Sequence, residues 1–308
     1  MSTYITDAFV QQYSANIFHL SQQKGSRLRS CVRNESQKGK AAFYDRMASV
    51  AAQVRTTRHG DTPQIDTVNS RRMVSMSDYE WADMIDDQDK VRMLIDPTSE
   101  YVVAAMWAMG RSMDDVIIAA LDGNAYSGEA GATSVALPST QKYAANDGTN
   151  FTNLNISTLR AVKKLFDAAD VDESIPRYLA YTSSQLFSLL GQTQVTSADF
   201  NSVKALVDGQ LDTFMGFKFI RIERLLTVSS GSASPTTGAY GSGTTVAGYR
   251  RCLAWAQDGA ILSVGQDMQS RVSERADKGY STQAYARMSI GATRMEEVKV
   301  VQIVCNES

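Results

Sequence analysis

The feature that most constrains the fold is a long amphipathic segment at residues 97–121. Asp96 is a favourable N-cap, Pro97 suits the first helical position, and Asp122-Gly123 provides a stop. Apolar side chains recur in steps of three and four through Val102, Met106, Met109, Met113, Val116 and Ala120. About 25 residues at 1.5 Å each predict a helix of roughly 37 Å, which we interpret as a structural strut.

The polar positions of this predicted helix include Arg111, Asp114 and Asp115, which we expect to lie away from the apolar stripe. A methionine-rich stripe is also a feature of promiscuous binding grooves. Packing in a core is the favoured interpretation, because methionine is most often buried.

Residues 1–50 are polar and basic, with a weak helical periodicity at Phe9, Tyr13 and Ile17. Such a segment has too little apolar surface to form a core of its own. We therefore expect an N-terminal arm whose order comes from a neighbouring molecule.

Residues 51–76 predict a long hairpin. Strands are expected at 54–57 and 65–76, and Gly60 and Pro63 supply the turn between them. Two strands alone bury little surface in water, so a polar hairpin of this kind needs a partner surface. This favours an assembly protein over a monomeric enzyme.

The rest of the chain alternates shorter elements, which predicts the α+β class. Helices are expected at 156–169, 184–190 and 198–207, and residues 228–245 predict an exposed flexible loop rich in Ser, Gly and Thr. Strands are expected at 177–181, 217–222, 249–255, 260–264, 268–272, 283–290 and 297–304.

The net charge is −2, but it is unevenly distributed. Residues 21–60 hold nine basic against two acidic residues, and residues 78–115 hold ten acidic against three basic ones. These segments are either two solvated surfaces, or a basic arm of one copy lying on the acidic segment of another. The basic arm could instead face DNA, which it would attract without regard to sequence.

No catalytic or cofactor-binding motif stands out. The chain has no G-x-S-x-G, Walker or H-E-x-x-H sequence, so we expect no enzyme activity and no cofactor. Cys31, Cys252 and Cys305 are expected to be free thiols packed as small apolar groups, and a zinc site is not expected. No apolar run is long enough to cross a bilayer and no signal peptide is recognisable, so we expect the protein to be kept in a cytoplasm and to have no membrane partner.

Two stretches resemble the major capsid proteins of tailed bacteriophages. The first runs from Arg58-His59-Gly-Asp61 through Ser70-Arg71-Arg72 to Asp78-Tyr79-Glu-Trp81 and on to Asp96-Pro97. The second is Ala108-Met-Gly110-Arg111-Ser-Met-Asp114-Asp115, which continues to Gly123. The resemblance implies the Hong-Kong-97-type capsid fold, a place in the virion and assembly in the host bacterial cytoplasm.

Under this resemblance the chain divides into five parts. Residues 1–50 form an N-terminal arm and residues 51–85 an E-loop that overlies a neighbouring subunit. Residues 86–124 belong to the peripheral domain with its spine helix at 97–121. Residues 125–265 form the axial domain, and residues 266–308 return as closing strands of the peripheral domain.

The implied function is a structural coat protein that self-assembles into an icosahedral head around double-stranded DNA. The implied partners are further copies, in hexamers and pentamers, with a separate scaffolding protein, a portal, a possible decoration protein and non-specifically contacted DNA. As subunit-interface residues we expect Arg55, Arg58, Asp61, Arg71, Arg72, Asp78, Glu80, Asp83, Asp86, Asp87 and Asp89.

Three alternatives remain at this point. An encapsulin-like nanocompartment shell would use the same fold to enclose an enzyme. A soluble α/β enzyme would use carboxylates in a deep pocket. A nucleic-acid-binding module would use the basic segment at 21–60 and bind with a steep salt dependence.

Overall fold

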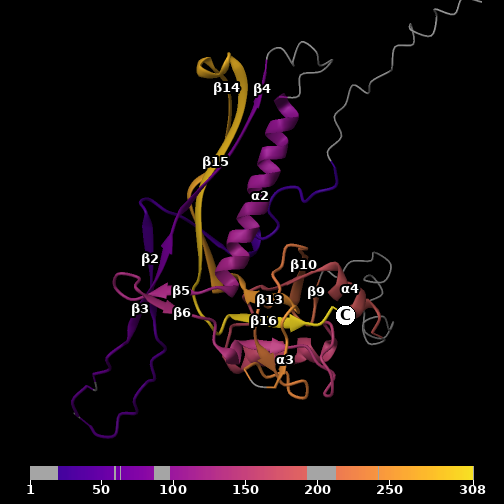
Figure 1. The fold of residues 1–308 in the computed structure, drawn as a ribbon. Helices are drawn as coiled ribbons and strands as arrows, with labels where there is room; N and C mark the ends of the chain where they lie inside the picture. Colours follow the sequence, from indigo (N-terminus) through magenta and orange to yellow (C-terminus); the bar gives the residue numbers. More distant parts are fainter. Residues whose placement is uncertain are drawn as a thin grey trace, which may run out of the picture. The chain divides into compact units, whose positions relative to one another are not determined.

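The structure, a computed structural model, describes residues 20–58, 60–62, 64–86, 98–192, 213–241 and 243–307. The chain divides into two compact units. Unit 1 consists of Met1–Ser26, Asp78–Ser112 and Gln266–Met288. Unit 2 consists of Arg27–Ser77, Met113–Gly265 and Ser289–Ser308. Helices and strands both occur along the chain, as Figure 1 shows, so the predicted α+β class is confirmed.

The predicted long helix is present as α2, Thr98–Asp122. It ends where expected, and the main-chain N–H of Gly123 donates to the carbonyl of Ala119 at 2.8 Å. Asp96 and Pro97 lie outside the described residues. The buried face follows steps of four through Ala105, Met109, Met113, Ile117 and Leu121. Two of the predicted stripe positions therefore lie at its centre, and the other four are half-buried at its edge.

Asp114 corrects the sequence prediction. The helix period places it beside Arg111 on a polar side, yet its side chain is completely buried. The reason is that its carboxylate accepts hydrogen bonds from the main-chain N–H groups of Arg27 and Leu28. A carboxylate satisfied in this way can be buried at tolerable cost.

The core of unit 2 is a six-stranded mixed sheet. Its strands lie in the order β7 (Lys142–Ala144), β16 (Val300–Cys305), β13 (Arg250–Ala256), β8 (Arg177–Tyr181), β10 (Phe217–Arg221) and β9 (Thr213–Phe214). Central strands of such a sheet are buried on both faces, which explains the nearly continuous apolar runs of β8, β13 and β16. The sequence located these strands and the alternating β10 within three residues of their ends.

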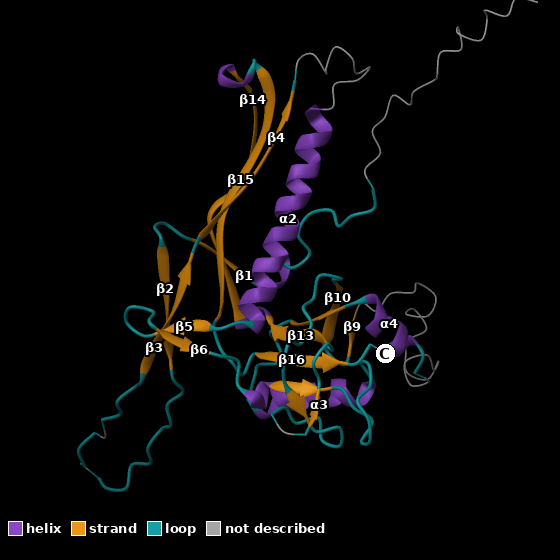
Figure 2. Cartoon of the chain, viewed as in Figure 1, coloured by secondary structure: helices purple, strands orange, loops and turns teal. Residues whose placement is uncertain are grey.

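The six-stranded sheet carries the two short helices that the sequence predicted (Figure 2). Helix α3, Ile156–Ala168, begins after Asn155, whose side chain accepts the main-chain N–H of Thr158 as an N-cap. It packs on the sheet through Phe166, whose ring centroid lies 5.9 Å from that of Phe217. Helix α4, Ser183–Leu190, begins with a capping box formed by Thr182 and Gln185. The helix predicted at 198–207 lies outside the described residues.

Strand β16 lies in the six-stranded sheet, and the expected domain boundary at residue 266 stays a prediction. Residues 266–308 were expected to return together as closing strands of the peripheral domain. Strand β16 pairs in parallel with β7 and antiparallel with β13, placing Ile303 beside Tyr143 and Cys252. An apolar strand of this kind needs partners on both edges and cover on both faces, and the interior of this sheet supplies them.

The predicted hairpin is present, but with a different first strand. Strand β3, Asn69–Ser75, pairs with β2, Ala41–Met47, and residues 54–57 form no strand. Strand β2 has the alternating burial of a strand with one covered face, which suits it to pair with β3. The predicted turn at 60–63 lies within the longer loop that joins the two strands. Strands β5 (Ala125–Ser127) and β6 (Thr133–Val135) complete this small sheet in the order β2-β3-β5-β6.

The predicted coreless arm is also partly wrong. Leu28, Cys31 and Val32 are buried around a short 3-10 helix, Arg29–Cys31. Strand β1, Arg33–Ser36, pairs in parallel with the start of β14, Ala260–Arg275. Residues 27–47 therefore fold within their own subunit, because three apolar side chains and two strands give them partners there.

Two further differences concern strands and a loop. The strands predicted at 260–264 and 268–272 are one continuous strand, β14, which joins β15 (Ser281–Arg294) and β4 (Ser77–Ile85) in the order β1-β14-β15-β4. The segment 228–245 forms short strands β11 (Ser232–Ala233) and β12 (Thr244–Thr245). Its apolar side chains enter a buried cluster with Ala144 and Val304, so it is not simply an exposed loop.

Candidate subunit interface

A long loop, residues 48–68, joins β2 to β3 in unit 2 and contains three of the predicted interface residues (Figure 1). Arg55, Arg58 and Asp61 are all exposed on it. Arg55 donates from Nε to the carbonyl of Thr57 at 3.0 Å, and its guanidinium group is accessible to solvent. Of the predicted turn residues, Gly60 lies in this loop and Pro63 lies outside the described residues.

The same loop, together with the last residue of β2 before it, leaves apolar side chains largely exposed in the described part of the subunit. Met47 at its start is 73% exposed, Val54 is 88% exposed and Val68 is 70% exposed. Single exposed apolar residues are ordinary, but several on one projecting loop are typical of a surface that another molecule covers. This loop is the strongest candidate for a contact between subunits.

Arg71 and Asp45 lie opposite each other on β3 and β2 at the base of this loop. Arg71 Nε donates to Asp45 Oδ1 at 3.0 Å, and its guanidinium lies 5.7 Å from the ring centroid of Phe43. The pair borders an open hollow of about 730 Å³, lined by Asp45, Arg46, Met47, Asn69, Ser70, Arg71, Ser127, Gly128 and Glu129. Arg71 is partly exposed and can meet a neighbouring molecule.

Arg72 lies on the other face of β3 and is buried within its own subunit. Together with Arg46 and Arg294 it surrounds Glu297, with which it forms an ion pair. Burial lowers the pKa of Arg72, and Glu297 opposes this effect. Strand alternation places Arg71 and Arg72 on opposite faces of β3, so Arg71 is partly exposed and Arg72 is buried.

Arg294 connects this buried cluster to three neighbouring segments. Its Nη1 donates to the carbonyls of Leu121 at 3.0 Å and Gly123 at 2.8 Å, and its Nη2 donates to that of Val135 at 3.1 Å. Burial lowers the pKa of Arg294, as it does for Arg72. We conclude that the cluster holds the end of α2 against β6 and β3. No motif in the sequence marked Arg46, Arg294 or Glu297 for this role.

The predicted acidic residues occupy β4 and its end in unit 1. Asp78 and Glu80 are exposed on this strand and Asp83 is half-buried. Asp86 follows the strand and accepts a hydrogen bond from the hydroxyl of Ser281. Asp87 and Asp89 lie outside the described residues.

Two exposed arginines lie near these acids in unit 1. Arg271 on β14 and Arg287 on β15 line a shallow hollow of about 290 Å³ together with Gln269, Ser270 and Tyr285. Burial and a hydrogen bond with Glu80 raise the pKa of Tyr285. This face of the sheet therefore carries charges of both signs.

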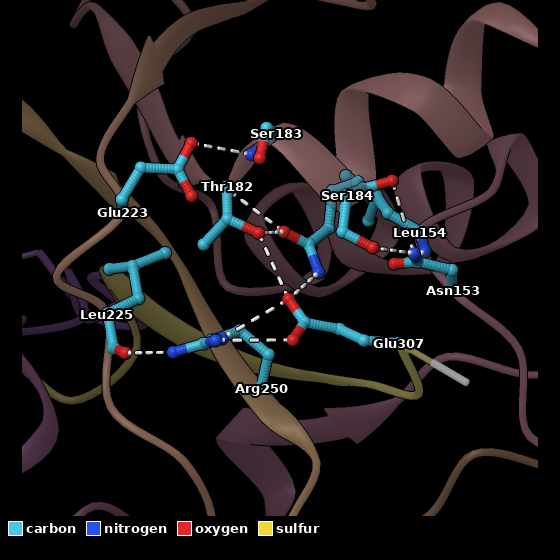
Figure 3. A network of polar contacts seen from close by, with 10 residues as sticks. Asn153, Leu154, Thr182, Ser183, Ser184, Glu223, Leu225, Arg250 and Glu307 are labelled. Carbon is cyan, nitrogen blue, oxygen red and sulfur yellow. Dashed lines mark hydrogen bonds and ion pairs between the residues drawn. The ribbon is translucent and has the colours of Figure 1, made fainter.

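A separate polar network fixes the C-terminal residues in unit 2 (Figure 3). Glu307 Oε1 accepts hydrogen bonds from Thr182 Oγ1 at 3.0 Å, Gln185 Nε2 at 3.0 Å and Arg250 Nε at 3.2 Å. Arg250 Nη1 also donates to the carbonyl of Leu225 at 2.8 Å. Burial raises the pKa of Glu307, but the hydrogen bonds from Arg250, Gln185 and Thr182 outweigh it and hold that pKa below its ordinary value.

The three cysteines are buried free thiols, as predicted. The neighbouring Cys252 and burial together raise the pKa of Cys305, and burial raises that of Cys31. Thiols of this kind are unreactive and serve as small apolar groups. Within the described ranges, no three histidine, cysteine, aspartate or glutamate side chains gather as metal ligands.

None of the helices in the part of the chain that the structure describes is both long and apolar enough to span a membrane. The features that dominate the described surface are an exposed loop, a mixed-charge sheet face and shallow hollows. These features fit contact between macromolecules better than the binding of a small substrate in an enclosed pocket.

Comparisons with known proteins agree with this interpretation. A family model described as phage capsid protein matches residues 5–307. The capsid of the cyanophage P-SCSP1u is similar in structure, with a TM-score of 0.75 at 13% identity over 100% of this chain and 96% of that chain. The capsid of the cyanophage Pam1 has a TM-score of 0.72 at 14% identity over 100% of this chain and 98% of that chain.

The capsid of Ralstonia phage GP4 is a third similar structure, with a TM-score of 0.69 at 11% identity over 96% of this chain and 95% of that chain. At these identities the structural likeness demonstrates the fold alone. The comparison with curated proteins finds no match. Because the family model spans nearly the whole sequence, the chain belongs to the phage capsid protein family.

Proposed function

We propose that this chain is the coat subunit of an icosahedral phage head, which assembles through pentamers and hexamers around double-stranded DNA. The single observation that carries the proposal beyond family membership is the loop 48–68. It exposes Val54 and Val68 with Arg55 and Arg58, next to Met47 at the end of β2, and all five side chains are exposed in the described part of the subunit. A repeated contact with a second copy would bury these groups.

The remaining expectations fit within this proposal. The loop with β2 and β3 serves as the E-loop, α2 as the spine helix, and the six-stranded sheet with α3 and α4 as the axial domain. The arm is restricted to the residues before Arg27, because residues 27–47 fold in unit 2. Scaffolding, portal and decoration proteins are proposed partners, and the host cytoplasm is the proposed site of assembly.

The proposed role is structural and not enzymatic. Membership of a capsid family supports this assignment, and so do the shallow, open hollows of the described surface. Among the alternatives, an encapsulin-like shell, a soluble enzyme and a nucleic-acid-binding module each lack a specific observation in their favour.

The test is to shorten the loop without touching its strands. Residues 50–66 are replaced by Asn-Gly, so that β2 ends intact and β3 keeps the buried Arg72. We expect the subunit to keep its circular dichroism spectrum and thermal midpoint but to form no shells or capsomers by negative-stain microscopy. A matched control replaces the same residues with a Gly/Ser linker of equal length.

The two replacements separate the proposal from simple damage. If the shortened subunit still forms closed shells, the loop is not the assembly contact and the proposal loses its main support. If the equal-length linker also abolishes assembly while the fold persists, the side chains of the loop are responsible and not merely its length.

A further inference from the structure

Helix α2 carries the sequence Gly110-Arg111-Ser-Met-Asp114, which has no part in the loop contact proposed above. These residues instead contact residues 22–28, mainly through the main chain of that segment. The contacts form two groups, and each group lies within one of the two units.

The first group, in unit 2, centres on Asp114. Its Oδ1 and Oδ2 accept the main-chain N–H of Arg27 at 3.1 and 3.0 Å, and Oδ1 also accepts that of Leu28 at 3.1 Å. Asp114 and Leu28 are both completely buried. A buried carboxylate is costly unless hydrogen bonds replace its water, and here main-chain donors make that replacement.

The second group, in unit 1, centres on Gly110. A Cβ at this position would lie 2.5 Å from the carbonyl carbon of Gly25 and 2.6 Å from its Cα, so a side chain cannot fit while the segment crosses here. Gly25 has a φ of 71°, which favours glycine at the crossing itself. Arg111 Nη1 donates to Gln22 Oε1 at 2.8 Å and to the carbonyl of Gln23 at 3.2 Å.

A cation–π contact adds to the second group, since Lys24 Nζ lies 5.3 Å from the ring centroid of Trp107. On α2, Trp107, Gly110 and Arg111 therefore contact residues 22–26 within unit 1, and Asp114 contacts Arg27 and Leu28 within unit 2. We call these two groups the arm seat. The seat contacts mainly main-chain groups, and Gly110 lets the two segments approach closely. Contacts of this kind depend little on the side chains of the segment that is bound.

We infer that the two groups of the arm seat bind residues 22–26 and residues 27–28 of the same subunit, each within its own unit, and that both are filled before assembly. The chain that follows supports a contact in cis. Leu28 enters the core directly after the seat, and Trp255 Nε1 donates to the carbonyl of Cys31 at 2.9 Å. The seat fixes the point from which the N-terminal residues leave, and Asp114 acts as a positioning residue.

The consequence for assembly rests on the proposed function: every copy would present its N-terminal residues from the same place. The seat itself can be tested without any shell. The probe is amide hydrogen exchange of the full-length, unassembled subunit, read at Arg27 and Leu28. The variants are D114A, the isosteric D114N and G110A, and the matched control is D115N, whose carboxylate pairs with Arg224 on the surface.

We expect the protection of the Arg27 and Leu28 amides to fall by about tenfold or more in D114A and G110A, and by less in D114N. D115N should retain wild-type protection. Trypsin should also cut faster after Lys24 and Arg27 in the seat variants. Thermal midpoints report whether each variant stays folded. If D114A is unfolded, the comparison is made with D114N.

Two results would overturn the inference. One is wild-type protection at both amides in D114N and G110A with the fold intact. The other is a wild-type subunit whose Arg27 and Leu28 amides exchange freely until shells form, since the seat would then be filled only in the assembly. Shell formation is scored separately by microscopy, so a failed seat and a failed coat function give different results.

Discussion

At the scale of single residues, Glu297 has the largest predicted effect on stability. Arg46, Arg72 and Arg294 all face its carboxylate, and Arg72 and Arg294 are almost wholly buried. Removing one partner of a buried ion pair leaves the other charge uncompensated, which costs about 3–5 kcal/mol. We expect E297Q to lower the free energy of unfolding by roughly this amount in urea titrations.

Glu296 offers a matched control one residue away. It pairs with Lys299 at 2.8 Å, and its side chain is 42% exposed. A surface pair of this kind contributes about 0–1 kcal/mol, so E296Q should be nearly neutral. Equal effects of E296Q and E297Q would mean that the buried arginines do not depend on Glu297.

Glu307 predicts a dependence of stability on pH. Its pKa lies below the ordinary value of 4.5 because the hydrogen bonds of Arg250, Gln185 and Thr182 outweigh its burial. A carboxylate with a lowered pKa stabilises the fold above its unfolded pKa, and this contribution is lost as the pH falls through the folded value. We expect E307Q to be less stable than the wild type by roughly 1–2 kcal/mol at pH 7.

The difference between the wild type and E307Q should shrink as the pH falls below about 4.5. The measurement is a series of urea midpoints from pH 7 to about pH 3. D61N, at an exposed residue of the loop 48–68, serves as a control and should follow the wild type. A pH-independent difference for E307Q would contradict the role given to its charge.

At the scale of secondary-structure elements, α2 contains two residues that the sequence predicts to be equally buried but that differ in burial in the structure. The 3.6-residue period places Met113 and Val116 in one stripe, but Met113 is completely buried and Val116 only half-buried. Truncating a buried methionine costs about 2–5 kcal/mol. We expect M113A to lose this much in urea titrations and V116A about 1 kcal/mol.

The elements that were predicted correctly from the sequence are those with local signals. Helix α2 has an amphipathic period and a stop, α3 and α4 have N-caps, and β8 is a continuous apolar run. Each of these signals acts over a few residues, so the elements could be predicted from their own segments.

The features that were not predicted at this scale have a non-local cause. The pairing of β2 with β3 across the loop 48–68, and the insertion of β16 between β7 and β13, depend on segments far away in sequence. The burial of Asp114 depends on Arg27 and Leu28 in the same way. Periodicity reports which face of an element is apolar, but it does not identify the main-chain donors that satisfy a buried carboxylate.

At the scale of the whole molecule, the sequence predicted an assembly protein because hairpin and arm lacked partners. In the structure, however, residues 27–47 do find partners, and these lie within the same subunit. The loop 48–68 remains, and Arg55, Arg58 and Asp61 on it are exposed as an interface would require. Arg72 is withdrawn from the proposed interface because it is buried.

Charge reversal on this loop tests how the subunits recognise one another. R55E/R58E changes two exposed side chains, so the free energy of unfolding should change by less than about 0.5 kcal/mol. Shell assembly should be lost if the loop of one copy meets the acids of β4 in another. The control R55K/R58K keeps both charges and should still assemble.

A second reversal identifies the partner surface. E80K/D83K changes two acids of β4 that lie in unit 1, and its assembly with R55E/R58E subunits should be restored when the two are mixed. Wild-type assembly should also weaken as salt rises, because exposed charges are screened. If R55E/R58E subunits form normal empty shells but fail to retain DNA, the loop faces the nucleic acid and the contact with β4 is wrong.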